Sequence, residues 1–207
     1  MPSVDERATQ QRLIDAARAL VEADGVEGLS MRKVAADVGV APTAIYWHIG
    51  GREALMHAVL DAMIADLPSL AARGSTPRTR IASLAAAMRS QVLATGPAHQ
   101  LAAELGRGAE LSFPAQVALA REVAAAGLSG HAAADAVRSV LFVVGGFIMI
   151  EDNYRHRQPG SRTTQELWQA VGEPGIDDDL RTTMATPTDT NALFTFTVER
   201  LLDSLLD

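Results

Sequence analysis

The sequence contains no cysteine and few aromatic residues, with five Phe, two Trp and two Tyr among 207 residues. Without cysteine there is no disulfide framework, no thiolate metal site and no cysteine nucleophile, which agrees with a reducing compartment. The first residues, Met1 to Glu6, lack the basic and apolar regions of a signal peptide. The longest apolar run, Val140 to Ile150, falls short of the ~20 residues of a membrane span. We therefore expect a soluble, cytoplasmic protein with no membrane partner.

Sequence motifs of enzymes are also missing: there is no GxSxG, no HExxH and no glycine-rich phosphate loop. We expect no enzymatic activity, no catalytic residue and no cofactor. A metal site remains an alternative at Glu151, Asp152 and His156, because positions 152 and 156 share a helix face. A surface ion pair is the favoured interpretation there, so we expect no bound metal. His57 and His131 have no visible partner and are interpreted as surface residues.

Positive charge is scarce. The net charge is −7, and residues 1–56 carry six basic against eight acidic side chains. Nucleic-acid-binding domains usually carry an excess of positive charge. Any DNA-binding face must therefore come from the placement of a few basic residues.

Helical spacing of apolar residues is present almost throughout, and no segment sustains a period of two. We predict an all-α protein. Leu13, Ala16, Ala17 and Leu20 form the apolar stripe of the first helix. The expected helices span about 6–23, 30–39, 42–50, 52–67, 77–94, 98–106, 114–126, 131–154, 177–185 and 189–206, with a loop-rich stretch at 155–175 and a polar connector at 71–80.

Two of these helices are short and have clear end signals. Ser30 can cap the first through its hydroxyl, and Gly39 stops it. Pro42 suits the first turn of the second, where its missing N–H costs nothing, and Gly50-Gly51 closes it. Two short helices joined by a tight glycine-containing turn have the dimensions of a helix-turn-helix.

The second short helix contains three consecutive rings, in the stretch APTAIYWHIG from Ala41 to Gly50. Ile45 and Ile49 are four residues apart and are expected to pack inward, which leaves Thr43, Ala44, Tyr46 and His48 pointing away from the core, with Trp47 either exposed or wedged into the domain. An aromatic cluster at helical spacing is usually core. Within the helix-turn-helix frame, however, methyl groups can touch thymine, and the Tyr hydroxyl or His can bond phosphate.

The segment GVEGLSMRKVAADVGVAPTAIYWHIGGREALMHAVLDAMI, Gly25 to Ile64, resembles the DNA-binding region of the TetR family of bacterial transcriptional regulators, and its YWH triplet resembles the tetracycline-repressor-like subgroup. The resemblance implies that Arg32 reads a base, that Pro42 begins the recognition helix, and that Arg52 is the basic residue opening the next helix. Pro42 and Ala44 stand where that subgroup has Gln and Thr, so a different operator is expected. The DNA-binding residues expected are Ser30, Arg32, Lys33, Pro42, Thr43, Ala44, Tyr46, Trp47, His48 and Arg52.

The second half resembles the family more loosely, in AAAGLSGHAAADAVRSVLFVVGGFIMIEDNY and FTFTVERLLDSLL. The resemblance implies that these two helices form a four-helix bundle with a second copy of the chain. The helix at 131–154 is apolar nearly all round and should be buried on several sides. Gly145-Gly146 inside it costs about 1 kcal/mol each and suggests a close backbone approach. The predicted dimer interface contains Val144, Gly145, Gly146, Ile148, Phe196, Leu201 and Leu205.

An effector pocket is expected in the second domain, largely apolar and suited to aromatic or multi-ring compounds. Glu151 aligns with a residue near the metal-drug complex of the subgroup. His99 is out of register with the direct metal ligand, so magnesium-tetracycline is not the expected effector. The predicted pocket residues are Met63, Leu67, Met88, Val92, Leu105, Phe113, Gln116, Val117, Arg138 and Phe142.

Together these features predict a helix-turn-helix domain at 1–51 and an effector-binding and dimerisation domain at 52–207, joined by the helix at 52–67. The expected function is a ligand-responsive repressor that binds a palindromic, double-stranded DNA operator as a homodimer and is released by a small, mostly apolar effector. The alternative is a small-molecule-binding module without specific DNA binding.

Overall fold

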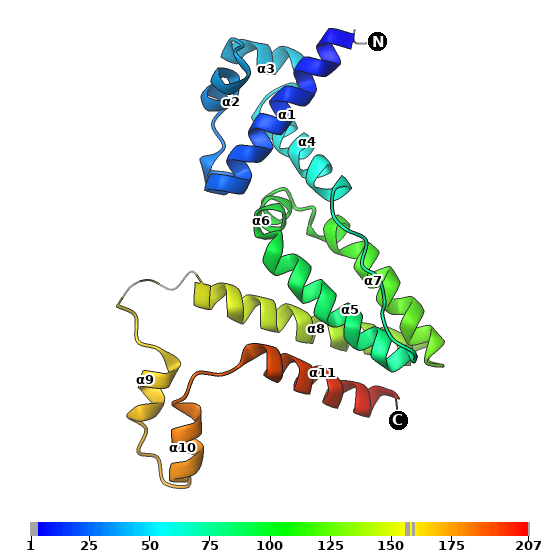
Figure 1. The fold of residues 1–207 in the computed structure, drawn as a ribbon, viewed down its shortest axis with the longest axis vertical. Helices are drawn as coiled ribbons and strands as arrows, with labels where there is room; N and C mark the ends of the chain where they lie inside the picture. Colours follow the sequence, from blue (N-terminus) through cyan, green and yellow to red (C-terminus); the bar gives the residue numbers. More distant parts are fainter. Residues whose placement is uncertain (1–3, 156–157, 159, 207) are drawn as a thin grey trace. The chain divides into compact units, whose positions relative to one another are not determined.

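The computed structural model describes residues 4–155, 158 and 160–206. These residues form eleven α-helices and one 3₁₀ helix, η1, with no strand among them, which confirms the all-α prediction (Figure 1). The bounds are α1 Val4–Asp24, η1 Val26–Gly28, α2 Met31–Val38, α3 Pro42–His48, α4 Arg52–Ala65, α5 Pro77–Ala94, α6 Gly96–Glu104, α7 Gly108–Ala125, α8 Gly130–Arg155, α9 Thr164–Gln169, α10 Asp178–Met184 and α11 Thr190–Leu206.

The chain divides into two compact units, one containing residues 1–71 and 90–118 and the other residues 72–89 and 119–207. Helices α5 and α7 each contribute residues to both units. The predicted division into a DNA-binding domain, 1–51, and an effector-binding domain, 52–207, is defined by function and not by compactness. It stays a prediction.

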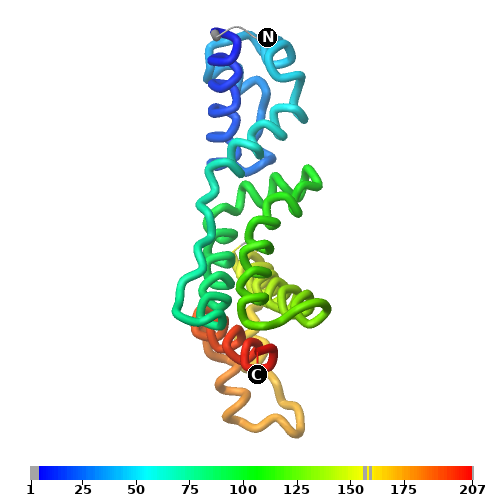
Figure 2. Tube along the Cα trace, turned by 90° about the vertical axis from the view of Figure 1, so that its right-hand side faces the viewer, coloured from blue at the N-terminus to red at the C-terminus, as the bar shows by residue number. Residues whose placement is uncertain are grey.

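The core of the first unit lies between α1 and α4, with α6 packed against it. Helix α1 contacts α2, α3 and α4, as its path in Figure 1 and Figure 2 shows. Leu13 and Ala17 of its predicted stripe are fully buried, and Ala16 and Leu20 pack partly buried beside them. From α6, Leu101 completes the same core. Burying such side chains stabilises the unit by roughly 1.5–3 kcal/mol for each large one.

The second unit is held together where α8 packs on α11. The rings of Phe147 and Phe194 meet edge to face with centroids 5.1 Å apart. The guanidinium of Arg89, from α5, lies 4.8 Å from the centroid of Phe194 and forms an ion pair with Glu151 of α8. It also donates to Asn191 of α11, so one side chain joins three helices.

Glu151 is therefore a buried partner of Arg89, and this ion pair lowers the pKa of its carboxyl. The expectation of a surface ion pair is wrong for Glu151, whose partner is a largely buried arginine from another helix. For Asp152 and His156 it stays a prediction. Within the described part of the chain, no three His, Asp or Glu side chains lie close enough to hold a metal ion. His156 lies outside the described residues.

Two elements differ from the sequence expectation. Helix α7 begins at Gly108 and not at Pro114, which lies inside it and removes the backbone hydrogen bond that a non-proline residue would donate one turn back. The stretch predicted as loop-rich contains α9, whose start is a capping box between Thr163 and Glu166. The added N-terminal part of α7 is held by packing, because Leu111 is buried in the core of the first unit. Helix α9 is instead started by its local capping box.

Helix α8 was expected to be buried on several sides, and within one chain this is wrong. Phe142 is 80% exposed and Met149 70% exposed. At 26 residues, α8 is also long and apolar enough by length and composition to cross a membrane, although its uninterrupted apolar run is shorter. The same composition occurs in helices that pack against a second protein chain, so an unpaired apolar face is what the structure establishes.

Candidate DNA-binding surface and ligand cavity

Helices α2 and α3 are held in a helix-turn-helix by the signals read from the sequence. The Ser30 side chain accepts the backbone N–H of Lys33, and Gly39 adopts the left-handed conformation with φ 77°. Pro42 lies in the first turn of α3. Arg12 of α1 adds a contact that the sequence did not reveal, because its guanidinium donates to the carbonyl of Val38, 2.7 Å away. The turn is thus fixed from both sides.

Helix α3 has one buried and one exposed side. Ile45 is fully buried, whereas Tyr46 is 61% exposed and Trp47 91% exposed. Thr43 is exposed, and Ala44 and His48 are half-buried. The predicted orientation is confirmed for Ile45, Thr43 and Tyr46, and Trp47 is exposed and not wedged into the domain. An indole in water has its large apolar face available to a partner.

Exposed basic side chains lie on the two helices that precede and follow α3 in the chain. Arg32 is exposed on α2, and Lys33 beside it lies 3.5 Å from the carboxylate of Asp24. Arg52 opens α4 and lies 3.9 Å from Glu104, with a second contact from its guanidinium to the sulfur of Met56 at 3.1 Å. Arg52 therefore shares its charge with Glu104, whereas the Arg32 side chain has no hydrogen-bond or ion-pair partner among the described residues.

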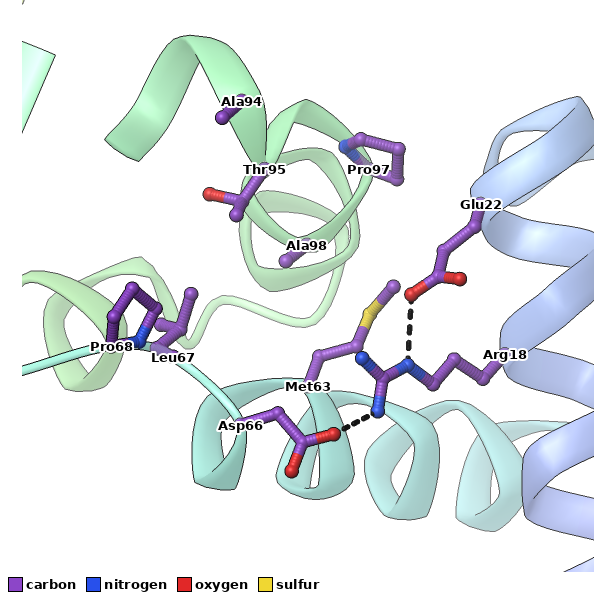
Figure 3. A pocket seen from close by; sticks show the side chains of 10 residues that line it. All are labelled: Arg18, Glu22, Met63, Asp66, Leu67, Pro68, Ala94, Thr95, Pro97 and Ala98. Atoms are coloured by element: carbon purple, nitrogen blue, oxygen red, sulfur yellow. Dashed lines mark hydrogen bonds and ion pairs between the residues drawn. The ribbon is translucent and has the colours of Figure 1, made fainter. Parts of the chain in front are cut away.

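A cavity of about 390 Å³ lies in the same unit (Figure 3). Figure 3 shows Arg18 reaching between Glu22 and Asp66 at its edge. The Nε of Arg18 lies 2.8 Å from Glu22, its Nη1 is paired with Asp66, and these two bonds raise the pKa of Arg18. The lining residues are Arg18, Glu22, Met63, Asp66, Leu67, Pro68, Ala94, Thr95, Pro97 and Ala98.

Of the ten predicted pocket residues, this cavity brings together two, Met63 and Leu67. Phe113 and Phe142 are 63% and 80% exposed. Gln116 donates to Ser112, and Arg138 lies 3.3 Å from Asp135 on its own helix. Met88 is buried, and Val92, Leu105 and Val117 are half-buried. None of these eight lines the cavity, and their role in an effector pocket stays a prediction.

The predicted dimer residues lie on α8 and α11. The prediction is wrong for Val144, which is only 3% exposed. It packs inside its own chain and has almost no surface for contact with a second chain. Gly145 and Gly146 have no heavy atom within 4 Å of an added Cβ. Phe196 is 55% exposed, and Ile148, Leu201 and Leu205 are half-buried. The close backbone approach expected at the glycines is thus not made by this chain.

Long-range arginine contacts are the features that the sequence reasoning missed. Arg18 meets Asp66, and Arg107 meets Asp61 of α4 at 2.8 Å and Glu110 at 2.6 Å. These hydrogen bonds raise the pKa of Arg107 and lower that of Glu110. No local pattern signals a pair that lies 46 or 48 residues apart, so only the fold reveals them.

A model of bacterial regulatory proteins of the tetR family matches residues 13–59, the segment that forms most of α1 and all of α2 and α3. A helix-turn-helix-type transcriptional regulator from Saccharopolyspora erythraea is 30% identical over 160 residues, which are 75% of this chain and 66% of that regulator. Other curated relatives match over 53 to 59 residues and are covered over 20% to 43% of their lengths.

Solved structures share the fold over nearly the whole chain. ActR from Streptomyces coelicolor, in complex with actinorhodin, has a TM-score of 0.64 and 18% identity, with 100% of this chain and 98% of that chain covered. BioQ from Mycobacterium smegmatis, with its double-stranded DNA operator, has a TM-score of 0.55 and 23% identity, with 95% and 97% covered. The family match falls on the helix-turn-helix described above and the likeness in fold extends to the remaining helices. The chain therefore belongs to the TetR family of bacterial regulatory proteins.

Proposed function

We propose that the chain is a repressor that binds a near-palindromic DNA operator as a homodimer in the cytoplasm and is released by a small effector. The observation that carries the proposal is the exposure of Tyr46 and Trp47 on α3 and of Arg32 on α2, in a helix-turn-helix held by the fully buried Val34 and Ile45. BioQ, which shares the fold, is described in complex with its operator. The exposed rings and the guanidinium supply the base and phosphate contacts that a major-groove helix makes.

Homodimerisation is supported by the apolar face that α8 and α11 leave open. Phe142, Met149, Ile150 and Phe196 are each about half exposed or more. Two copies of this face, related by a twofold axis, cover each other, and the open Gly145-Gly146 pair allows two helices to cross closely. A dimer of this kind places its two recognition helices on half-sites about one DNA turn apart, roughly 34–36 Å.

Effector response is supported by a preformed cavity of about 390 Å³ next to α1 and α4, within the size range of small-molecule sites. ActR is described with bound actinorhodin, which illustrates that this fold accepts small molecules. Ligands that favour one conformation of a regulator change its affinity for DNA by their own difference in affinity between the two states.

The test is a titration of fluorescently labelled duplexes with the full-length protein, using the region upstream of its gene and a shuffled duplex of equal length. Trp47→Ala is expected to reduce operator affinity by about tenfold or more, since it removes a large contact. Trp168→Ala, on α9, is the matched control and should leave DNA binding unchanged. Equal affinity for both duplexes would favour the small-molecule module without specific DNA binding.

A further inference from the structure

The cavity of the first unit has an apolar floor and a charged edge. Met63 and Ala98 are buried, and Leu67 and Pro97 lie half-buried beside them, so the floor offers carbon surface on α4 and α6. Apolar contacts of this kind favour a compact apolar body over a string of polar groups. These contacts do not select the charge of the ligand, which depends on the charged residues at the edge of the cavity.

The edge carries one positive and two negative groups. Arg18 lies between Glu22 and Asp66, with side-chain exposures of 29%, 50% and 64%, and the sum of the three charges is negative. Within the described chain, Oε2 of Glu22 and Oδ1 of Asp66 accept no hydrogen bond. The edge thus retains two charged acceptors, which attract a cation and disfavour a free anion.

We propose that this cavity is the effector site and that its ligand is a small apolar molecule with a single positive charge, its apolar body against Met63 and Ala98 and its ammonium against Glu22 and Asp66. The proposal rests on the regulatory function above and deepens it. It differs from the sequence expectation of a pocket with few charges, formed by residues 52–207 alone, because Arg18 and Glu22 of the predicted helix-turn-helix domain also line the cavity.

The position of the two carboxylates links occupancy to the DNA-binding helices. Asp66 directly follows α4, whereas Arg18 and Glu22 belong to α1, the helix that also packs on α2 and α3. An ammonium bound to Oδ1 of Asp66 shares the charge of this carboxylate with Arg18 and so weakens the bridge between α1 and the end of α4. Ligand binding is thereby coupled to the contact between α1 and the end of α4, and α1 also packs on the recognition helix α3.

The test compares three probes with one naphthalene body: 1-naphthylmethylammonium, 1-naphthalenemethanol and 1-naphthylacetate. Each is titrated by calorimetry into the full-length protein without DNA. The ammonium is expected to bind about tenfold more tightly than the alcohol, because a charge-assisted hydrogen bond is added, and the carboxylate should bind most weakly. Equal affinities, a preference for the carboxylate, or no binding of any probe would overturn the proposal.

Three variants locate the site. Glu22→Gln and Asp66→Asn, both at exposed side chains that tolerate replacement, should remove the preference for the ammonium and leave the alcohol affinity unchanged. Ala94→Phe, at an exposed lining position, should reduce binding of all three probes. Glu27→Gln, an exposed acidic position outside the cavity, is the matched control.

Persistence of the ammonium preference in Glu22→Gln and Asp66→Asn would overturn the site. Operator binding is measured separately in the absence of probe. If the wild-type protein does not bind the operator specifically, the proposed function is contradicted, whereas the ligand result is unaffected. Failure of the proposed function and failure of the ligand proposal are therefore distinguishable.

Discussion

At the scale of single residues, the contrast within α3 explains how a short helix serves two surfaces. Ile45 is fully buried, while Trp47, two positions later, is almost entirely exposed. The four-residue spacing of Ile45 and Ile49 made the burial of Ile45 predictable, whereas the sequence left the position of Trp47 open. The Arg12 contact to the Val38 carbonyl was not predictable, since it joins residues 26 apart and has no local pattern.

The two candidate DNA-contacting arginines should behave differently. Arg32→Ala is expected to lose ~1–3 kcal/mol on the operator and to relax specificity at one base pair, because Arg32 is exposed and is assigned a base contact. Arg52→Ala should weaken binding to all sequences alike and reduce the salt slope by roughly one phosphate, with the loss moderated by its pairing to Glu104. The measurement is operator and random-duplex binding across a salt series. Equal losses on both duplexes from both variants would contradict the assignment.

Glu151 offers a residue-scale test of the second unit. Its folded-state pKa lies below the ordinary value of 4.5 because of Arg89, so its contribution to stability is fully present above about pH 5 and is lost as pH falls through the folded pKa. Glu151→Gln should therefore cost about 3 kcal/mol or more near pH 7, since it leaves a buried guanidinium without its charge partner.

The measurement is thermal unfolding between pH 7 and pH 3. The difference in the free energy of unfolding between wild type and Glu151→Gln should become smaller as the pH falls. Asp203→Asn is the control, because the Arg78–Asp203 pair is over one-third exposed and such pairs contribute about 1 kcal/mol or less. A gap that stays constant with pH would show that the charge of Glu151 does not stabilise the fold.

At the scale of elements, end signals predicted helices well where they were local. Ser30, Gly39 and Pro42 placed the ends of α2 and the start of α3 within about one residue, and the expected end of α3 was two residues too late. Pro42 and Pro114 show the limit of this reasoning. Both were read as helix starts, but Pro114 lies inside α7, because packing of the flanking turns outweighs one missing hydrogen bond. Helix α9 has only six residues, too few for an apolar period to be visible.

For a substitution in helix α8, a monomeric chain and a dimer predict opposite changes in stability. In a lone chain, Gly146→Leu should stabilise the helix by up to about 1 kcal/mol, because an added side chain meets open space and leucine is the better helix former. In a dimer that crosses at this glycine, the same change overpacks the interface and should cost about 1–3 kcal/mol or split the dimer. We expect the second outcome by sedimentation and thermal unfolding, with Ala134→Leu near the start of α8 as the control. A stabilised variant that remains a dimer would place the crossing elsewhere.

At the scale of the whole molecule, the negative net charge and the proposed DNA partner are reconciled by placement. Arg32 and Lys33 lie on the helix-turn-helix, while acidic residues such as Glu22 and Asp66 belong to the edge of the cavity. The sequence predicted the fold class and the exposed side of α3 at Thr43 and Tyr46, because both depend on local patterns. That these residues face DNA stays a prediction. It could not place the cavity, because Arg18 and Ala94 come together only through tertiary packing.

The central claim is that a dimer of this chain reads two half-sites of one operator. Its most direct test is footprinting of the full-length protein on the DNA upstream of its gene. The account predicts two protected major-groove segments, related by twofold symmetry and centred about 10–10.5 base pairs apart or a multiple of this spacing, both lost in Arg32→Ala at the same protein concentration. A single protected segment, or uniform protection without sequence preference, would contradict it.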